Sequence, residues 1–418
     1  MNIADLYKLY KKNFLVDTDT RSIQKNTLFF ALKGANFNGN KFAEEALKKG
    51  ALYSIVDEKK YQTSDNIILV DNVLETLQQL ALYHRQQLTI PIIALTGSNG
   101  KTTTKELINK VLSEGYKTTA TQGNLNNHIG VPLTLLTITP ETEIAIIEMG
   151  ANHFKEIAFL CEIAQPDYGY ITNFGKAHLE GFGSIEGVIQ AKSELYDYLK
   201  INNKTAFVNT NDPIQVEKTK NSTRILFDKT ITFLEVNPFV KLSFQDKIIQ
   251  SNLIGKYNYP NMAAAITIGK YFKISAEKIK QAIESYTPDN NRSQIIKTKR
   301  NTIILDAYNA NPTSMVAALE NFNMVSSKNK TVILGDMFEL GDTSLEEHQK
   351  IADLASSFNF NNLFFVGENF YKTKTEKHQF KTFDLLKKHL QLYPIENNLI
   401  LIKGSRGMAL ERVLPQIS

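Results

Sequence analysis

From residue 90 onward the chain repeats one pattern, in which a short apolar run is followed by a polar or glycine-rich loop and then by a stretch with helical spacing. Apolar runs of this length are typical of strands buried on both faces of a sheet. Strands that alternate with helices predict an α/β fold with mostly parallel sheets and helices on both faces. The runs lie at residues 92–95, 144–148, 168–171, 302–305, 332–334, 363–366 and 399–402.

Two other regions differ from this pattern. The first eighty or so residues mix brief apolar runs with helical stretches, which predicts a small α/β unit. Residues 206–253 are β-rich with many turns and lead into two predicted helices, and the polar stretch 287–291 has the composition of a linker. We therefore expect domains over residues 1–86, 87–288 and 289–418, the last with Rossmann-like proportions.

Composition narrows the class of protein. The 418 residues are 42% hydrophobic and 22% charged, as in ordinary globular proteins, and the length suits two or three domains. Lys plus Arg exceed Asp plus Glu by 48 to 43 without a basic block, which argues against a nucleic-acid partner. No signal peptide or membrane-spanning run is visible, so we expect a cytoplasmic protein without a membrane partner, and a monomer. The single cysteine, Cys161, excludes an internal disulfide.

The strongest local signal is a glycine-containing loop between a predicted strand and a predicted helix. Glycines let the backbone approach an anion, the helix start presents free N–H groups, Lys101 adds a cation, and the Thr102 hydroxyl can hold Mg²⁺. Leu95 stands where the general phosphate-loop spacing has glycine. We prefer a nucleoside triphosphate site to a chance glycine turn. Its expected contacts are Gly97, Ser98, Asn99, Gly100, Lys101, Thr102 and Thr103.

Three further residues become candidates through their position. Glu148 ends an apolar strand, at the sheet edge where ligands of α/β proteins bind. His178 lies in a glycine-rich loop after the strand at 168–171, close to the same edge. Lys192 falls within a predicted helix, where spacing alone indicates a solvated side chain. Taken singly, a strand-end glutamate is as compatible with a surface role as with a site, and a histidine on such a loop is usually a surface or packing residue.

Taken together and in this order, the motifs resemble the Mur ligases, the ATP-dependent amide ligases that build the peptide stem of peptidoglycan. The resemblance covers essentially the whole chain. It is carried by residues 96–103, 121–132, 148–150, 173–183, 191–194, 255–261, 291–293, 306–312, 334–341 and 404–406.

The resemblance implies a metal and nucleotide site. It implies that Lys101 and Thr102 contact the phosphates of ATP. It also implies that Lys192 carries a carbamate formed from CO2, which would turn a cation into an oxygen ligand. Two Mg²⁺ ions are expected, and their ligands would then be Thr102, Glu148, His178 and carbamylated Lys192. The catalytic set would consist of Lys101, Lys192, His178 and Glu148.

The resemblance also assigns substrate contacts. Asn258 and Asn261 would lie near the adenine, and Arg292 and Asp306 would close on the γ-phosphate and ribose. Residues 19–42 are similar to the UDP-sugar-binding domain, although Asn40 and Lys41 depart from the family's pattern. The expected contacts with the peptide substrates and the UDP-sugar are Thr20, Arg21, Asn124, Asn126, Asn127, Asn309 and Asn311.

Within the family, the stretches 124–132, 308–312 and 335–341 are most similar to the branch that joins D-alanyl-D-alanine to UDP-N-acetylmuramoyl-tripeptide through an acyl phosphate. That reaction belongs to cell-wall synthesis and, through it, to cell shape and division. The diaminopimelate-adding branch is the weaker alternative, because its Asp-Asn-Pro-Arg motif is absent. A non-catalytic nucleotide-binding homologue is the alternative from another class.

Overall fold

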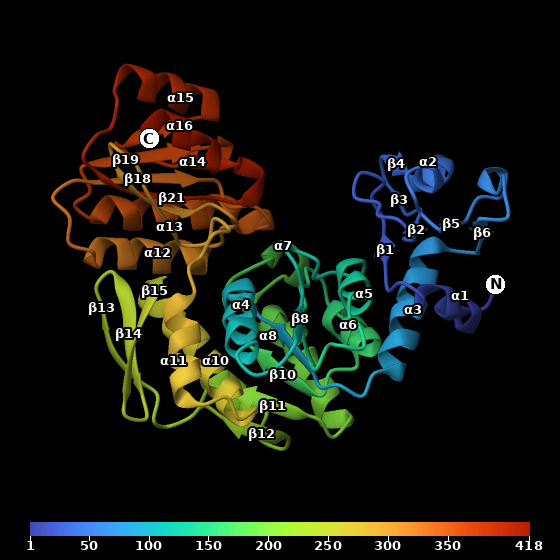
Figure 1. Ribbon diagram of the computed structural model, residues 1–418. Coiled ribbons are helices and arrows are strands. Elements are labelled where there is room, and N and C mark those ends of the chain that lie inside the picture. Colours follow the sequence, from blue (N-terminus) through green and yellow to red (C-terminus); the bar gives the residue numbers. More distant parts are fainter.

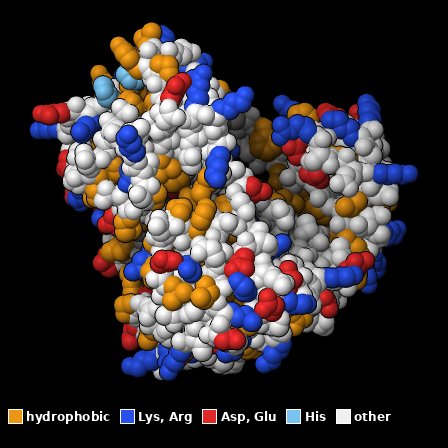
Figure 2. Space-filling model, turned by 60° about the vertical axis from the view of Figure 1, so that its left-hand side comes forward, with side chains coloured by type: hydrophobic (Ala, Val, Ile, Leu, Met, Phe, Trp, Pro, Cys, Tyr) orange, Lys and Arg blue, Asp and Glu red, His pale blue; other side chains and the backbone are white.

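The computed structural model describes residues 1–418 and contains three main sheets, each with its own helices (Figure 1). We call the parts built on these sheets the N-terminal, central and C-terminal units. In Figure 1 the N-terminal unit (blue) and the C-terminal unit (orange to red) stand on opposite sides above the central unit. Figure 2 shows the surface deeply hollowed between the lobe at the right and the remainder. No helix has the length and apolar character needed to cross a membrane.

The N-terminal unit is a small parallel sheet of order β1-β2-β5-β6. Its strands are β1 (Val16–Asp17), β2 (Leu28–Phe30), β5 (Tyr53–Val56) and β6 (Ile67–Leu69), with a β3 (Lys33–Gly34) and β4 (Phe37–Asn38) hairpin at one end. The helices are α1 (Ile3–Tyr10), η1 (Gly39–Phe42), α2 (Ala43–Lys48), η2 (Lys59–Tyr61) and α3 (Val73–Gln87). The small α/β unit expected from the sequence is confirmed.

The central sheet is entirely parallel, of order β12-β11-β10-β7-β9-β8. Its middle strands are buried along their length, as the continuous apolar runs predict. The strands are β7 (Ile92–Thr96), β8 (Thr118–Ala120), β9 (Ile144–Glu148), β10 (Tyr168–Ile171), β11 (Thr205–Val208) and β12 (Thr223–Leu226). The helices are α4 (Lys101–Leu112), α5 (Gly130–Leu135), α6 (Glu156–Ala164), α7 (Leu179–Phe182), α8 (Ile185–Ile201), α9 (Pro213–Lys218), α10 (Tyr259–Tyr271) and α11 (Ala276–Ser285).

The region 206–253, expected as one β-rich stretch, is divided between two sheets, because β11 and β12 join the central parallel sheet. The rest forms a separate antiparallel sheet of three strands, β13 (Thr232–Val236), β14 (Phe239–Phe244) and β15 (Lys247–Ile254). Along β14, half-buried and buried positions alternate, because one face of this sheet packs on apolar side chains and the other faces water. The short helix η3 (Lys256–Asn258) then leads into α10.

The C-terminal sheet has the order β16-β17-β21-β18-β19-β20 and is mixed, because β16 runs antiparallel to β17. Its strands are β16 (Gln294–Lys297), β17 (Thr302–Asp306), β18 (Lys330–Gly335), β19 (Asn362–Val366), β20 (His378–Phe380) and β21 (Leu399–Lys403). The helices are α12 (Pro312–Met324), η4 (Gly341–Thr343), α13 (Ser344–Ser357), α14 (Glu368–Tyr371), α15 (Phe383–Leu392), η5 (Arg406–Met408), η6 (Leu410–Val413) and α16 (Leu414–Ile417).

The units are joined in different ways. Helix α3 of the N-terminal unit packs against α5 and α6, and one hydrophobic cluster runs from Leu6 through Leu80 to Val208 without a break between the two units. The N-terminal and central units therefore share a core. The apolar clusters of the C-terminal unit draw almost entirely on its own residues, with only Ile254, Leu179 and Phe239 added from the central unit.

Candidate functional site

A cavity of about 550 Å³ opens between the central and C-terminal units, at the edge of the central sheet where the strands β7 and β9 end. This is the edge at which ligands of open parallel sheets bind. Most of the residues selected from the sequence line it, although they come from distant parts of the chain. They are Ser98, Asn99, Gly100, Lys101, Thr102, Thr103, Asn124, Asn126, Asn127, Glu148, His178, Asn258, Asn261, Arg292, Asp306, Asn309 and Asn311.

The glycine-containing loop connects β7 to α4 as expected. A Cβ atom on Gly97, whose φ is +141°, would lie 2.0 Å from the Thr172 hydroxyl oxygen, and one on Gly100 would lie 2.9 Å from Asn261 Oδ1. Glycine is therefore required at both positions. Lys101 Nζ donates a hydrogen bond to the Gly97 carbonyl (2.7 Å), and burial lowers the pKa of this lysine. The loop holds a half-buried cation at a helix N-terminus, which suits a polyphosphate.

Glu148 ends β9 and is almost fully buried. The Thr102 hydroxyl donates to its Oε2 atom (3.0 Å), and Asn126 Nδ2 donates to its Oε1 atom (2.8 Å). The backbone N–H of Glu148 is held by the Thr121 hydroxyl oxygen (2.9 Å). A carboxylate and a hydroxyl oxygen thus lie in contact at the mouth of the phosphate loop, which is the donor set that Mg²⁺ prefers beside phosphates.

His178 precedes α7 with a left-handed backbone, at φ +53°. Its Nδ1 atom lies 2.5 Å from Oε2 of Glu339, so the two side chains are in direct polar contact. The backbone N–H of Glu180 also donates to the Glu339 carbonyl (3.2 Å). The contact with His178, and then the charge of Lys101, lower the pKa of Glu339.

Glu339 was not selected from the sequence, although it lies in the stretch 334–341 that carries the family resemblance. No spacing rule connects residue 339 with residue 178, because the contact exists only where the two units meet.

Lys192 does not line the cavity and is not solvated, so the expectation from helical spacing alone is wrong. Its side chain on α8 is fully buried, and Nζ donates to the Ala151 carbonyl (3.0 Å) beside the Phe182 ring. Burial, and then the charge of Lys101, lower the pKa of Lys192 well below its usual value. The amine therefore lies behind the wall of the cavity that Ala151 forms.

The C-terminal unit contributes Arg292 and Asp306. Asp306 accepts a hydrogen bond from the Ser293 backbone N–H (3.0 Å) and pairs with Lys403 Nζ (2.6 Å). Lys403 was missed by sequence reasoning, and its one signal is a lysine at the end of a buried apolar strand. The guanidinium carbon of Arg292 lies 3.6 Å from the centre of the Tyr308 ring.

Asparagine side chains connect the two units at the phosphate loop. Asn311, the N-cap of α12, donates from Nδ2 to Asn99 Oδ1 (2.7 Å). At the start of α10, Asn261 Nδ2 donates to Asn258 Oδ1 (2.9 Å). Asn309 Oδ1 accepts the N–H of the next residue and Asn309 lines the cavity. Amide groups from both units thus lie around one space.

Thr20 and Arg21 lie outside this cavity, in the N-terminal unit. The Arg21 guanidinium is exposed and pairs with Asp19, and the Thr20 hydroxyl donates to Glu45 at 3.4 Å. The structure therefore does not bring these two residues together with the phosphate loop.

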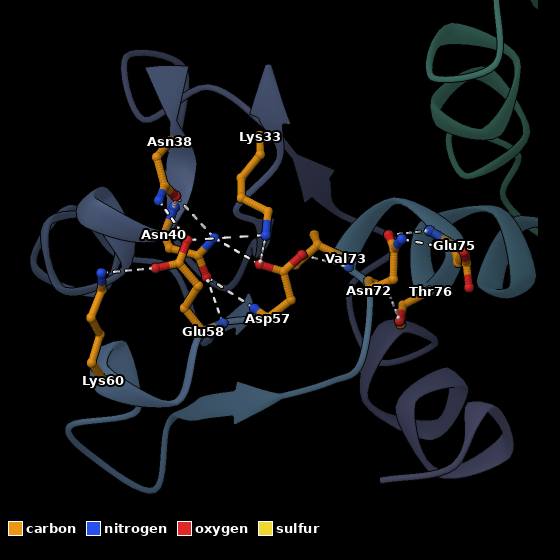
Figure 3. Close-up of polar contacts among 10 residues, drawn as sticks. All are labelled: Lys33, Asn38, Asn40, Asp57, Glu58, Lys60, Asn72, Val73, Glu75 and Thr76. Carbon is orange, nitrogen blue, oxygen red and sulfur yellow. Dashed lines mark hydrogen bonds and ion pairs between the residues drawn. The ribbon is translucent and has the colours of Figure 1, made fainter. Parts of the chain in front are cut away.

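The neighbouring Asn40 is buried and fully engaged by the protein (Figure 3). Its amide exchanges hydrogen bonds with Asp57 (2.9 Å each way), and Asp57 in turn pairs with Lys33 (3.0 Å) and accepts from the Val73 N–H at the start of α3 (3.3 Å). The departure from the family's pattern at Asn40 thus forms an internal link between the β3–β4 hairpin and α3. Lys33, about half exposed, is the member of this link that faces water.

Models of protein families match residues in each of the three units. Residues 15–85 match the Mur ligase family catalytic domain, residues 95–269 match the Mur ligase middle domain, and residues 291–406 match the Mur ligase glutamate ligase domain.

Similar proteins extend over the whole chain. The UDP-N-acetylmuramoyl-tripeptide–D-alanyl-D-alanine ligase of Bacillus subtilis is 35% identical over 100% of this chain and 97% of its own, and that of Escherichia coli is 33% identical over 96% and 92%. MurF from Acinetobacter baumannii superposes with a TM-score of 0.84 at 31% identity, covering 96% of this chain and 92% of its own. MurF from Thermotoga maritima in complex with ADP gives 0.83 at 26% identity and covers 96% of both chains. The chain belongs to the Mur ligase family.

Proposed function

We propose that this protein is the ATP-dependent, ADP-forming ligase that joins D-alanyl-D-alanine to UDP-N-acetylmuramoyl-tripeptide in peptidoglycan precursor synthesis. The observation that carries the proposal is the single cavity in which the phosphate loop, the Thr102–Glu148 pair and Arg292 of the C-terminal unit meet. Relatives that are 32–35% identical over nearly the full chain bear the name of this activity.

Forming an amide from a carboxylate in water requires an activated acyl group. In the proposed reaction the tripeptide carboxylate attacks the γ-phosphorus of ATP, so that an acyl phosphate forms and ADP leaves. The amine of D-alanyl-D-alanine then attacks the acyl carbon, loses a proton and expels inorganic phosphate. Lys101 and Arg292 offset the negative charge that a carboxylate and a triphosphate bring together.

Mg²⁺ fits the residues at the mouth of the phosphate loop. Thr102 and Glu148 would hold one ion, because Mg²⁺ in nucleotide sites takes one or two protein oxygens and completes its shell with phosphates and water. The ion would supply Lewis-acid neutralisation of the phosphates. No group of three or more acidic, histidine or cysteine side chains gathers here, which agrees with a site completed by the nucleotide.

A second Mg²⁺ and a carbamate on Lys192 are further parts of the proposal. Only an unprotonated amine adds to CO2, and full burial beside the Phe182 ring favours the neutral form of Lys192. His178 lines the cavity and would serve the second ion.

We assign the substrates by the units that line the cavity. Asn124, Asn126 and Asn127 belong to the central unit and would contact the peptide donor, whereas Asn309 and Asn311 belong to the C-terminal unit and would contact the acceptor dipeptide. The UDP moiety is assigned to the N-terminal unit, with Thr20 and Arg21 as its expected contacts. The boundaries near residues 86 and 289, the monomeric state and the cytoplasmic location stay predictions.

The test is ADP release from ATP in the presence of UDP-N-acetylmuramoyl-tripeptide, with D-alanyl-D-alanine or diaminopimelate as acceptor. We expect turnover that depends on D-alanyl-D-alanine and is abolished in Lys101→Ala. Turnover with diaminopimelate on a dipeptide donor would instead favour the sister ligase. Nucleotide binding without turnover for any acceptor would mean a non-catalytic homologue.

A further inference from the structure

Tyr308 and Arg292 form a stacked pair in the wall of the cavity. The guanidinium carbon lies 3.6 Å from the ring centre, well within the distance of a cation–π contact. Both residues line the cavity, but they come from different segments, the linker before β16 and the loop after β17. A second guanidinium, that of Arg406, lies farther from the ring at 5.7 Å and pairs with Glu411.

Hydrogen bonds connect the chain segment that carries Arg292 with the segment that carries Tyr308. The Tyr308 N–H donates to the carbonyl of Asn291 (3.2 Å), and the Ser293 N–H donates to Asp306 Oδ1 (3.0 Å). Arg292 is thus held between two hydrogen bonds to the loop that carries Tyr308. The pair is fixed in both backbone and side chain, which makes it a built feature of the cavity and not a chance approach.

Arg292 is not neutralised by a partner in this position. Its Nε atom is buried and has no hydrogen-bond acceptor. Its charge is near enough to Lys101 to contribute, after burial, to the lowered pKa of that lysine. Lys101 faces the same space and is influenced by Glu148 and Glu339, whereas the Arg292 guanidinium has no ion-pair partner and is therefore available to an anion.

The stacking of the Arg292 guanidinium on a ring explains why an aromatic residue suits position 308. A guanidinium presents its N–H donors around the edge of its plane, and stacking on an aromatic ring occupies the face and leaves those donors free. A carboxylate partner would instead occupy the donor edge. The ring can therefore orient Arg292 without competing with a phosphate for its N–H groups.

We propose that Tyr308 is a positioning residue that holds Arg292 so that the N–H edge of the guanidinium meets the γ-phosphate of ATP. This inference rests on the proposed function. Tyr308 acts through Arg292 and supplies ring area, whereas its hydroxyl plays no part.

The test compares Tyr308→Phe, which keeps the ring, with Tyr308→Leu, which removes it, and uses Tyr371→Leu on the exposed side of the same unit as the matched control. For Tyr308→Leu we expect kcat to fall about tenfold, the size of a partly desolvated cation–π contact, with a smaller change in KM for ATP. Tyr308→Phe and Tyr371→Leu keep wild-type kcat. By calorimetry, Tyr308→Leu weakens binding of a non-hydrolysable ATP analogue and leaves ADP binding unchanged.

A double-mutant cycle with Arg292→Lys isolates the coupling, because lysine keeps the charge and loses the planar stack. We expect Tyr308→Leu to add little to Arg292→Lys. The inference is overturned if Tyr308→Leu behaves as wild type, if Tyr308→Phe loses as much as Tyr308→Leu, or if the two effects are additive, since Tyr308 would then act on a substrate directly. A failure of the proposed function can be distinguished from a failure of this inference, because in the first case the wild-type protein itself would lack acceptor-dependent turnover.

Discussion

A lysine amine enclosed by protein loses its proton readily, and Lys192 is enclosed completely. The Ala151 carbonyl can accept a hydrogen bond from a neutral amine as well as from an ammonium group. The same burial that makes an ammonium costly makes the amine available to CO2.

From this we predict that Lys192→Ala abolishes ligase activity, because no oxygen ligand can form at that position. A short-chain carboxylate added to the assay of this variant should partly restore the activity. With isotope-labelled bicarbonate, carbon NMR should show one carbamate signal in the wild-type protein that is missing from Lys192→Ala. Lys200→Ala, an exposed change at the end of the same helix, serves as the control. Full activity of Lys192→Ala would refute the carbamate.

Single residues also show how far the site could be predicted. Lys101, Thr102 and Glu148 were found because each stands at a strand end or helix start, where chain position fixes the side chain's place. Glu339 could not be found by such a rule, because its partner His178 is distant in sequence. Lys403 does stand at a strand end, but nothing in the local pattern connects it with its partner Asp306. Tertiary packing, and not local pattern, creates those contacts.

At the scale of elements, helix α4 follows the phosphate loop and also forms hydrogen bonds with the linker to the C-terminal unit. Glu106 on this helix accepts hydrogen bonds from the Tyr286 hydroxyl (2.6 Å) and Asn290 Nδ2 (2.9 Å), both at the linker that enters the C-terminal unit. Burial, and then the charge of Glu106, raise the pKa of Tyr286. Helix α4, which starts at the phosphate loop, is thus tied directly to the linker that enters the C-terminal unit.

We predict that Glu106→Ala loosens this linker. Loss of two hydrogen bonds, each worth about 1 kcal/mol, corresponds to an increase in local opening of about thirtyfold. Limited proteolysis should therefore cut residues 286–292 faster by a similar factor. Glu114→Ala, just beyond the end of the same helix, should leave the cleavage rate unchanged. Equal cleavage of Glu106→Ala and wild type would show that the linker is held elsewhere.

Periodicity predicted the buried strands β7, β9, β10, β17, β18, β19 and β21, because the buried strands of a parallel sheet are continuous apolar runs. The three-stranded sheet β13–β15 was expected only as short β-rich pieces, since pairing depends on partners that sequence pattern does not name. Strand β16 was not expected, because its residues Gln294–Lys297 are half-buried or exposed at a sheet edge and show no apolar run.

At the scale of the whole molecule, the joint between the N-terminal and central units contains a buried histidine. His84 on α3 contacts the Tyr7 hydroxyl through Nδ1 (3.2 Å) and the Ile138 carbonyl through Nε2 (3.0 Å). Tyr10 and Phe14 pack around the ring. Burial lowers the pKa of His84 below 6.5.

This gives a prediction for pH dependence. Because the pKa of His84 is lower in the folded state, the unfolded chain takes up a proton at a higher pH than the folded protein does. The contribution of neutral, buried His84 to stability is therefore complete above about pH 6.5. It is lost as the pH falls through the folded-state pKa. Urea unfolding followed as a function of pH should show this loss in the wild-type protein and a shallower one in His84→Gln. His153→Gln, on an exposed loop, should retain the wild-type profile. Identical slopes for His84→Gln and wild type would contradict the assignment.

The shared core also sets how the protein can be divided. Helix α3 ends the N-terminal unit, yet its apolar face, with Leu77 and Leu80, completes the packing of α5 and α6. A fragment that starts after Gln87 would uncover that surface and is expected to aggregate. A fragment that stops before the linker keeps its apolar clusters nearly intact. We therefore expect the C-terminal unit to be separable and the first two units to fold together as one block.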